Sequence, residues 1–264
     1  MAQPVAHSYG KSAVTVYRVE GDRLFACEVR MLVSGDAFLS SYTEGDNSLV
    51  VATDSMKNFV QQTALDFRGE SLEDFLALAA RRFLDRYEHV DSVRIEGREA
   101  TFAQRAGLVR QRLYDDHGFA WLDVGRSGIR RHRSGRRALH LVKLSGSSFA
   151  GFVGDEFTTL PESHDRPLFV HLDVEWTHAD FERRPAVADV RQLVVDTFAD
   201  LHSASIQHLV HEMGTRALER FDEIDEIEFS AENRLWDTAD QREGATVYTD
   251  ARPPYGEIHL VLRR

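Results

Sequence analysis

The side chains with the clearest capacity for chemistry lie in the second half of this 264-residue sequence, at Phe149, Arg166 and Gln207. Arg166 carries a planar guanidinium fork, which suits a carbonyl oxygen beside a ring nitrogen. Gln207 has a donor and an acceptor on one amide, so it can pair with the amide-like edge of a heterocycle. Phe149 can stack on the face of such a ring. These residue types favour a clamp for a flat, polar heterocycle.

A second candidate feature lies in the first half, where Thr53 and Asp54 follow a polar segment, 44–48, and an apolar run, 49–52. The polar segment predicts a turn, and the apolar run predicts a short buried strand. Threonine and aspartate are typical capping residues, so a helix is expected to begin here with its first backbone amides free. Such amides can hold an anionic heterocycle.

Each of these residues has an ordinary explanation when it is taken alone. An arginine after an aspartate is usually a surface ion pair, and a phenylalanine usually belongs to the core. His208 and His211 lie at i and i+3 on an expected helix and are followed by Glu212, and zinc or iron sites can use the spacing of this histidine pair. No third and fourth ligands follow at a matching spacing, so we expect a solvated helix face and no metal.

Composition and charge restrict the class of protein. A formal net charge of −11 argues against nucleic-acid binding, which depends on Lys and Arg meeting phosphates. Cys27 is the single cysteine and lies in a strand-like run, which indicates a core residue in a reducing compartment. No stretch approaches the roughly 18 apolar residues of a membrane span. We therefore expect a soluble, cytoplasmic protein without nucleic-acid or membrane partners.

One pattern of elements occurs twice along the chain: two strands, two helices and two strands. In the first half we expect strands at 14–19, 24–33, 90–95 and 100–121 and helices at 54–67 and 72–87. In the second half we expect strands at 138–144, 168–176, 224–229 and 258–262 and helices at 187–198 and 205–221. Antiparallel strands with helices on one face predict an α+β fold of two modules, residues 1–134 and 135–264. Glycines and arginines at 125–137 are interpreted as a solvated linker, with an anion-binding patch as the alternative.

Four segments of the chain resemble the urate oxidase family. They are Tyr9-Gly10-Lys11, Thr53-Asp54, the run from Ser147 through Phe149 to Asp165-Arg166, and Ser203-Ala204-Ser205-Ile206-Gln207. They occur in the family's order and with family-like spacing over nearly the whole chain, so together they reverse the ordinary explanation of each residue. Leu144 departs from the pattern, since a small hydroxylated or β-branched residue usually follows the lysine there.

The resemblance implies a fold, an assembly and an activity. Urate oxidases contain tandem tunnelling-fold modules whose sheets join across subunits into a barrel, usually in a homotetramer with sites at subunit interfaces. They oxidise urate with dioxygen and need no cofactor or metal. Sequence patterns alone indicate neither the barrel nor the tetramer, although open sheet edges are often closed by subunit pairing. We therefore expect a cofactor-independent oxidase of urate or a closely related oxopurine or heterocycle.

The resemblance also implies residue roles. Phe149, Arg166, Gln207 and the backbone amide of Ile206 would clamp the substrate, and Thr53 with the amide of Asp54 would receive its five-membered ring. Lys11, Thr53 and Asn233 would act in catalysis, the first two in proton transfer and the last beside dioxygen or water.

The segment Asn233-Arg234-Leu235 departs from the family, which usually carries histidine at the third position. That histidine joins the lysine and threonine in a proton relay, and leucine can neither accept nor pass a proton. Three explanations stay open. The protein is a weak urate oxidase whose relay uses Lys11 and water, a relative that acts on a different oxopurine, or a non-catalytic purine-binding sensor or scaffold.

Overall fold

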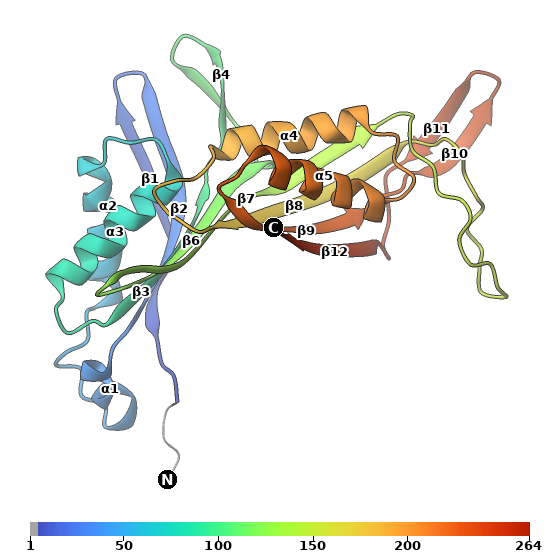
Figure 1. The fold of residues 1–264 in the computed structure, drawn as a ribbon. Coiled ribbons are helices and arrows are strands. Elements are labelled where there is room, and N and C mark those ends of the chain that lie inside the picture. The colour runs from blue at the N-terminus through green and yellow to red at the C-terminus, as the bar shows by residue number, and fades with distance from the viewer. Residues whose placement is uncertain (1–4) are drawn as a thin grey trace. The chain divides into compact units, whose positions relative to one another are not determined.

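The computed structural model describes residues 5–264 and divides the chain into two compact units, Met1–Ser134 and Gly135–Arg264 (Figure 1). Each unit combines antiparallel strands with two long helices. The α+β class expected from the sequence is therefore confirmed. Among the residues described, no helix is both long and apolar enough to cross a membrane.

The first unit is built on strands that pair in the order β1-β2-β3-β6. These strands are β1 (Tyr9–Glu20), β2 (Arg23–Ser34), β3 (Ser92–Glu99) and β6 (His117–Gly125). Buried and more exposed residues alternate along β3 and β6, so each strand presents one face to the core. Cys27 on β2 is buried, and burial raises the pKa of its thiol to about 12.

Two helices cover this sheet, α2 (Thr53–Asp66) against β1 and α3 (Leu72–Arg86) against β3 and β6. The Ser71 side chain caps α3, because its Oγ accepts a hydrogen bond from the Asp74 amide at 3.2 Å. At Gly97 on β3, an added Cβ would lie 3.0 Å from a methyl carbon of Leu72 and 3.1 Å from one of Leu76. The absent side chain therefore lets α3 approach the sheet closely.

Two short helices and a hairpin complete the first unit, and two sequence predictions in this unit are corrected. The short helices are η1 (Asp36–Phe38) and α1 (Ser40–Thr43). Residues 49–52 form no strand, because only Val51 is buried and the chain turns at Leu49. The expected long strand at 100–121 is interrupted by a hairpin, β4 (Phe102–Ala106) and β5 (Val109–Arg112), which turns at Gly107 with φ of 53°.

Strand β7 (Gly128–Lys143) corrects the interpretation of residues 125–137 as a solvated linker. It begins in the first unit and continues into the second. Within this strand, Arg137 forms an ion pair with Glu175. Arg126, just before the strand, donates to the carbonyl oxygens of Leu84 and Tyr87 at 2.7 Å each, where α3 ends. Cations placed at a helix C-terminus satisfy its free carbonyls.

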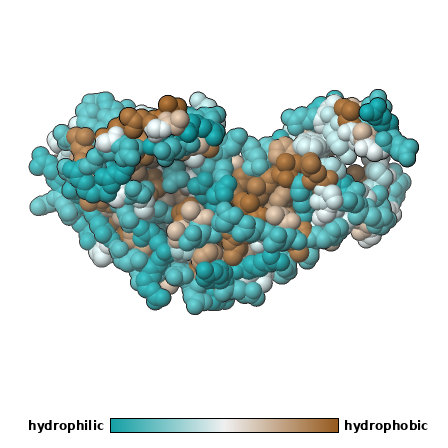
Figure 2. All heavy atoms as spheres, turned by 90° about the horizontal axis from the view of Figure 1, so that it is seen from above, coloured by the Kyte–Doolittle hydropathy of each residue, from teal (hydrophilic) through white to brown (hydrophobic). Residues whose placement is uncertain are grey.

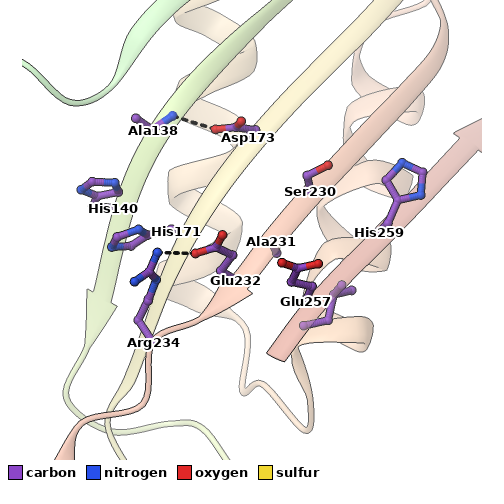
Figure 3. A pocket seen from close by; sticks show the side chains of 11 residues that line it. Ala138, His140, His171, Asp173, Ser230, Ala231, Glu232, Arg234, Glu257 and His259 are labelled. Atoms are coloured by element: carbon purple, nitrogen blue, oxygen red, sulfur yellow. Dashed lines mark hydrogen bonds and ion pairs between the residues drawn. The ribbon is translucent and has the colours of Figure 1, made fainter. Parts of the chain in front are cut away.

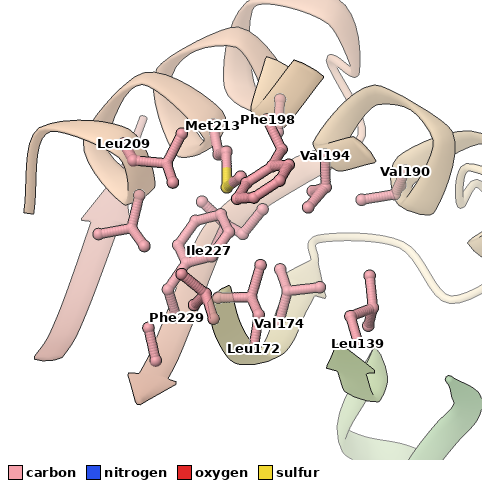
Figure 4. Close-up of a cluster of buried hydrophobic side chains, with 14 of the residues drawn as sticks. Leu139, Leu172, Val174, Val190, Val194, Phe198, Leu209, Met213, Ile227 and Phe229 are labelled. Carbon is pink, nitrogen blue, oxygen red and sulfur yellow. The ribbon is translucent and has the colours of Figure 1, made fainter. Parts of the chain in front are cut away.

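In the second unit the strands β8 (Leu168–His178), β9 (Ile224–Asn233) and β12 (Gly256–Arg263) pair in that order. The helices are α4 (Val187–Asp200) and α5 (Ile206–Arg220), and a separate hairpin is formed by β10 (Asp237–Arg242) and β11 (Ala245–Thr249). Side chains from both helices meet those of the strands in one core (Figure 4). That core contains Leu172 and Val174 of β8, Phe198 of α4, Met213 of α5 and Phe229 of β9.

Candidate functional site

A cavity of about 200 Å³ in the second unit contains the predicted clamp residues. It is lined by Ser147, Ser148, Phe149, Leu160, Arg166, Leu168, Ser205, Ile206, Gln207, Asn233, Gly256, Glu257 and Ile258. These residues come from the loop before β8, the start of α5, the end of β9 and the start of β12. The fold therefore brings together Phe149, Arg166, Ile206, Gln207 and Asn233.

Arg166 lies just before β8, where its backbone amide donates to the Ser147 carbonyl oxygen at 2.8 Å. Its guanidinium carbon lies 5.7 Å from the centre of the Phe149 ring. The Nε atom is buried and has no hydrogen-bond partner within residues 5–264. Burial also lowers the pKa of the guanidinium. A buried donor without an acceptor is costly, so this side chain is well suited to a ligand that supplies one.

The backbone of Phe149 exchanges two hydrogen bonds with the backbone of Ser163, at 2.7 and 2.9 Å, and these bonds fix the position from which the Phe149 ring projects. Phe152 stacks on it with ring centres 4.9 Å apart and an interplanar angle of 15°. The loop that carries Phe149 is thus fixed as a short antiparallel bridge, although most of this loop is exposed. This arrangement presents an aromatic ring beside Arg166.

Ser203 connects this loop to the start of α5. The Ser148 amide donates to the Ser203 carbonyl oxygen at 2.8 Å, and the Ser203 amide donates to that of Gly146 at 2.9 Å. The Asp165 carboxylate accepts a hydrogen bond from the Gly146 amide at 2.7 Å, and this bond is the main cause of the lowered pKa of Asp165. These hydrogen bonds hold the segments at 146–148, 165 and 203 together beside the cavity, although the segments lie far apart in the sequence.

Helix α5 points its N-terminus at the cavity. Ser205 is the N-cap, and its Oγ accepts from the His208 amide at 3.1 Å. Ile206 and Gln207 occupy the first turn, where helix geometry leaves backbone amides without intrahelical acceptors. The positive end of the helix dipole adds to these donors, so this end of the cavity favours a carbonyl or an anionic ring edge.

Asn233 is the last residue of β9, opposite Gly256 of β12 in the strand pairing. Its Oδ1 atom is buried and has no hydrogen-bond partner in the part of the chain that the structure describes. Leu235, two residues later, is half-buried and does not line the cavity. Trp236 follows it and lies between Phe169 and Tyr248, with ring centres 6.1 and 5.8 Å away.

The other predicted residues, Lys11, Thr53 and Asp54, lie in the first unit. Lys11 precedes a bulge in β1, and Thr53 begins α2. Contrary to the expected cap, the N-cap position belongs to Ala52, and no side chain caps this helix. Lys57, by hydrogen bond and charge, is the main cause of a lowered pKa at Asp54, and the charge of Lys11 also contributes. Lys11 and Asp54 are therefore electrostatic neighbours.

A larger cavity of about 630 Å³ lies over the strands of the second unit, on the face away from the core (Figure 3). His140 and His171 stack there with ring centres 3.7 Å apart, and Arg234 pairs with Glu232. Glu257 and Ile258 line both this larger cavity and the 200 Å³ cavity around Arg166, which we call the clamp cavity. Within residues 5–264, no group of three or more His, Cys, Asp and Glu side chains is arranged to hold a metal ion. Sequence patterns gave no signal for Glu257, because its place depends on how β12 pairs with β9.

The chain is similar to known uricases over most of its length. The uricase family model matches residues 7–119 and 132–259. The chain is 39% identical over 260 residues to a uric acid degradation bifunctional protein of Bacillus sp. strain TB-90, covering 88% of this chain and 52% of that protein. It is 36% identical over 269 residues to a uricase of Halalkalicoccus jeotgali, covering 87% and 88% of the two chains.

Solved structures are similar over nearly the whole chain. A crystal structure of a uricase from Bacillus fastidious has a TM-score of 0.91 at 33% identity, covering 97% of this chain and 93% of that one. The urate oxidase of Bacillus sp. TB-90 has a TM-score of 0.89 at 35% identity, covering 98% and 100%. The chain spans 52% and 61% of the length of the two bifunctional relatives that it matches.

Proposed function

Because the chain belongs to the uricase family, we propose that it is an oxidase that acts on urate or a closely related oxopurine with dioxygen and without a cofactor. The observation that carries the proposal is the cavity in the second unit. There the half-buried Arg166, whose Nε atom is buried and has no hydrogen-bond partner within residues 5–264, lies beside Phe149, the start of α5 and Asn233. These groups offer donors to carbonyl oxygens and a ring for stacking, which together suit an oxidised purine.

In this proposal the second unit holds the substrate. Arg166 donates to a carbonyl and an adjacent ring nitrogen, and the Ile206 amide donates to the same carbonyl. Gln207 pairs with the amide edge on the opposite side of the ring, and Phe149 stacks on its face. The Asn233 amide is assigned to hold dioxygen or water above the ring, and its unpaired Oδ1 can accept a hydrogen bond from such a water.

The first unit supplies the remaining groups in the proposal. Thr53 and the amide of Asp54 receive the five-membered ring, and Lys11 with Thr53 assists proton transfer. The charge of Lys11 contributes to the lowered pKa of Asp54, which supports their action in one site. Residues 1–134 and 135–264 are proposed to be two tunnelling-fold modules in a homotetramer, with the barrel closed and the sites formed between subunits. We propose a cytoplasmic location, consistent with the single free cysteine.

A second candidate is a purine-binding protein that does not turn its ligand over. Leu235 favours it, because the residue two positions after Asn233 carries no group that can move a proton. In that case the clamp residues would bind the oxopurine and the protein would serve as a sensor or scaffold.

A panel of oxopurines, followed by ultraviolet absorbance and an oxygen electrode, separates these functions. The proposed oxidase consumes urate or a related purine together with dioxygen, and its rate does not change after treatment with a chelator. Binding without oxygen consumption would establish the second candidate. No binding of any purine would contradict both.

A further inference from the structure

We propose that Asp165 is a positioning residue of the clamp. Its carboxylate holds the turn 145–147 in place, and this turn sets the Arg166 guanidinium at the distance from the start of α5 that the substrate requires. The proposal rests on the proposed function of the site. Asp165 itself does not line the clamp cavity, and the resemblance to urate oxidases implies no role for it.

The Asp165 carboxylate accepts hydrogen bonds from the turn that precedes Phe149. The Gly146 amide donates to its Oδ1 at 2.7 Å. This bond is the main cause of the lowered pKa of Asp165, and hydrogen bonds from the Ser145 side chain and the Ser147 amide also contribute. Gly146 has a φ of 84°, a left-handed conformation that lets successive donors converge on one anion. The turn is therefore built around this carboxylate.

The charge of Asp165 is not paired with that of its neighbour Arg166. Within residues 5–264 no ion pair joins the two side chains, and neither charge contributes to the pKa shift of the other. An aspartate beside an arginine would ordinarily form a surface ion pair. Here the carboxylate binds the backbone of the turn, and the guanidinium keeps its charge for a ligand.

The same turn also holds the Arg166 backbone. The Arg166 amide donates to the carbonyl oxygen of Ser147 at 2.8 Å, and Ser147 is buried. The Arg166 Nε has no hydrogen-bond partner in the described part of the chain, so no protein acceptor at this atom fixes the direction of the side chain. That direction depends on the backbone and on the Phe149 ring, whose centre lies 5.7 Å from the guanidinium carbon. A shift of the turn would therefore move the guanidinium.

The turn is tied to the start of α5 as well. The Ser203 amide donates to the Gly146 carbonyl oxygen at 2.9 Å, and the Ser203 carbonyl oxygen accepts from the Ser148 amide at 2.8 Å. Ser203 is fully buried, and its hydroxyl donates to the carbonyl oxygen of Ser205, the N-cap of α5, at 3.1 Å. The turn therefore links Arg166 to the helix end that carries the opposite side of the clamp.

The test is a double-mutant cycle between Asp165→Ala and Arg166→Ala, measured by calorimetric titration of urate without oxygen. In wild type, Asp165→Ala should weaken urate affinity by about 10-fold, because a shifted guanidinium no longer aligns both donors with the ligand. In Arg166→Ala, the same change should weaken affinity by less than about 2-fold, because the group that Asp165 positions is gone. Thermal unfolding should show the same loss of stability in both backgrounds.

Two further variants separate positioning from folding. Asp165→Asn keeps an acceptor oxygen for the Gly146 amide and should lose less affinity than Asp165→Ala. Asp180→Ala is the matched control, because the Asp180 carboxylate also accepts a hydrogen bond from a backbone amide, that of Glu182 at 2.9 Å, and does not line the clamp cavity. It should lower stability and leave urate affinity unchanged.

Three results would overturn the proposal and leave the oxidase function standing. They are wild-type affinity in Asp165→Ala, an equal fold-loss in the two backgrounds, and a loss in Asp165→Asn as large as that in Asp165→Ala. If Asp165→Ala does not fold, the same cycle with Asp165→Asn decides, and kcat/KM for urate replaces calorimetry where the double variant binds too weakly. If wild type binds no urate, the proposed function falls and this inference falls with it.

Discussion

At the scale of single residues, Arg166 is the side chain whose loss should weaken ligand binding most. Its Nε is buried and unpaired, and its guanidinium lies beside the Phe149 ring. Arg166→Ala should weaken urate binding by about 2–4 kcal/mol, because a charged bidentate donor to a buried carbonyl is removed. Isothermal calorimetry without oxygen measures this change.

Arg184→Ala is the matched control, since Arg184 also lies over a phenylalanine ring, at 4.5 Å from Phe181, and does not line the clamp cavity. It should bind urate like wild type. Equal affinity for wild type and Arg166→Ala would remove Arg166 from the site.

Leu235 stands where the resemblance to urate oxidases leads us to expect a histidine. Leu235→His should raise urate turnover modestly, because it adds a titratable group two residues after Asn233. The gain should be limited, since Trp236 is packed between Phe169 and Tyr248 and restricts the room beside it. Steady-state kcat is the measurement, with Leu235→Gln as a polar control that does not titrate. A wild-type rate as high as that of an ordinary uricase would contradict the premise that proton transfer is impaired here.

At the scale of elements, the start of α5 links stability to binding. Ser205→Ala removes the side-chain cap on the His208 amide and should cost about 1 kcal/mol of folding free energy. It should also weaken urate binding, because the amides of Ile206 and Gln207 lose their fixed direction. Thermal unfolding and calorimetry report the two effects.

The pair of capped helices supplies a control for this prediction. Ser71→Ala removes the equivalent cap of α3, where Ser71 accepts from the Asp74 amide. It should lower stability by a similar amount and leave urate affinity unchanged. A matching loss of affinity in both variants would show that stability alone explains the effect of Ser205→Ala.

The elements also show what local sequence can predict. Helices α3 and α5 were predicted to within a residue or two, because a capping serine and a stripe of apolar residues are both local signals. The first part of strand β7, residues 128–137, and the hairpin β4–β5 were not predicted, whereas the rest of β7 agrees with the strand expected at 138–144. Arginines and glycines in β7 are stabilised by partners distant in sequence, such as Glu175 for Arg137, and no local pattern encodes such pairs.

The residues of the candidate site also divide into those that the sequence could predict and those that depend on the fold. Phe149, Arg166 and Gln207 were identified from residue type and family resemblance, and the structure places them around one cavity. The place of Glu257 beside this cavity could not be predicted from the sequence, because it depends on the register of β12 against β9. The predicted strand at 49–52 was wrong because an apolar run of four residues does not determine a strand when only one of them is buried.

At the scale of the whole molecule, exposed apolar side chains favour association. Figure 2 shows hydrophobic patches set in a mostly hydrophilic surface. Among the described residues, Tyr114 is 80% exposed in the first unit, and Val153 and Phe157 are 86% and 82% exposed in the second. Large exposed side chains of this kind, when clustered, mark interaction surfaces. These side chains favour association, and the resemblance to urate oxidases implies the subunit number, so we predict a homotetramer of the 30.0 kDa chain.

Light scattering after size-exclusion chromatography tests this assembly. A mass near four chains is expected at micromolar concentration. Phe157→Asp should shift the mass toward smaller species, because a charge would be buried without a partner, and Glu156→Gln is a neighbouring control that should not. A stable monomer would remove the shared-site arrangement of the two units.

The central claim is that this chain oxidises an oxopurine with dioxygen at the clamp around Arg166. The most direct measurement follows urate absorbance and dissolved oxygen in the same cuvette, for wild type and Arg166→Ala, in the presence of a metal chelator. We expect wild type to consume urate and oxygen in equal amounts, and Arg166→Ala to consume neither at a comparable rate. Urate that binds to wild type without loss of oxygen, or equal rates for the two proteins, would contradict it.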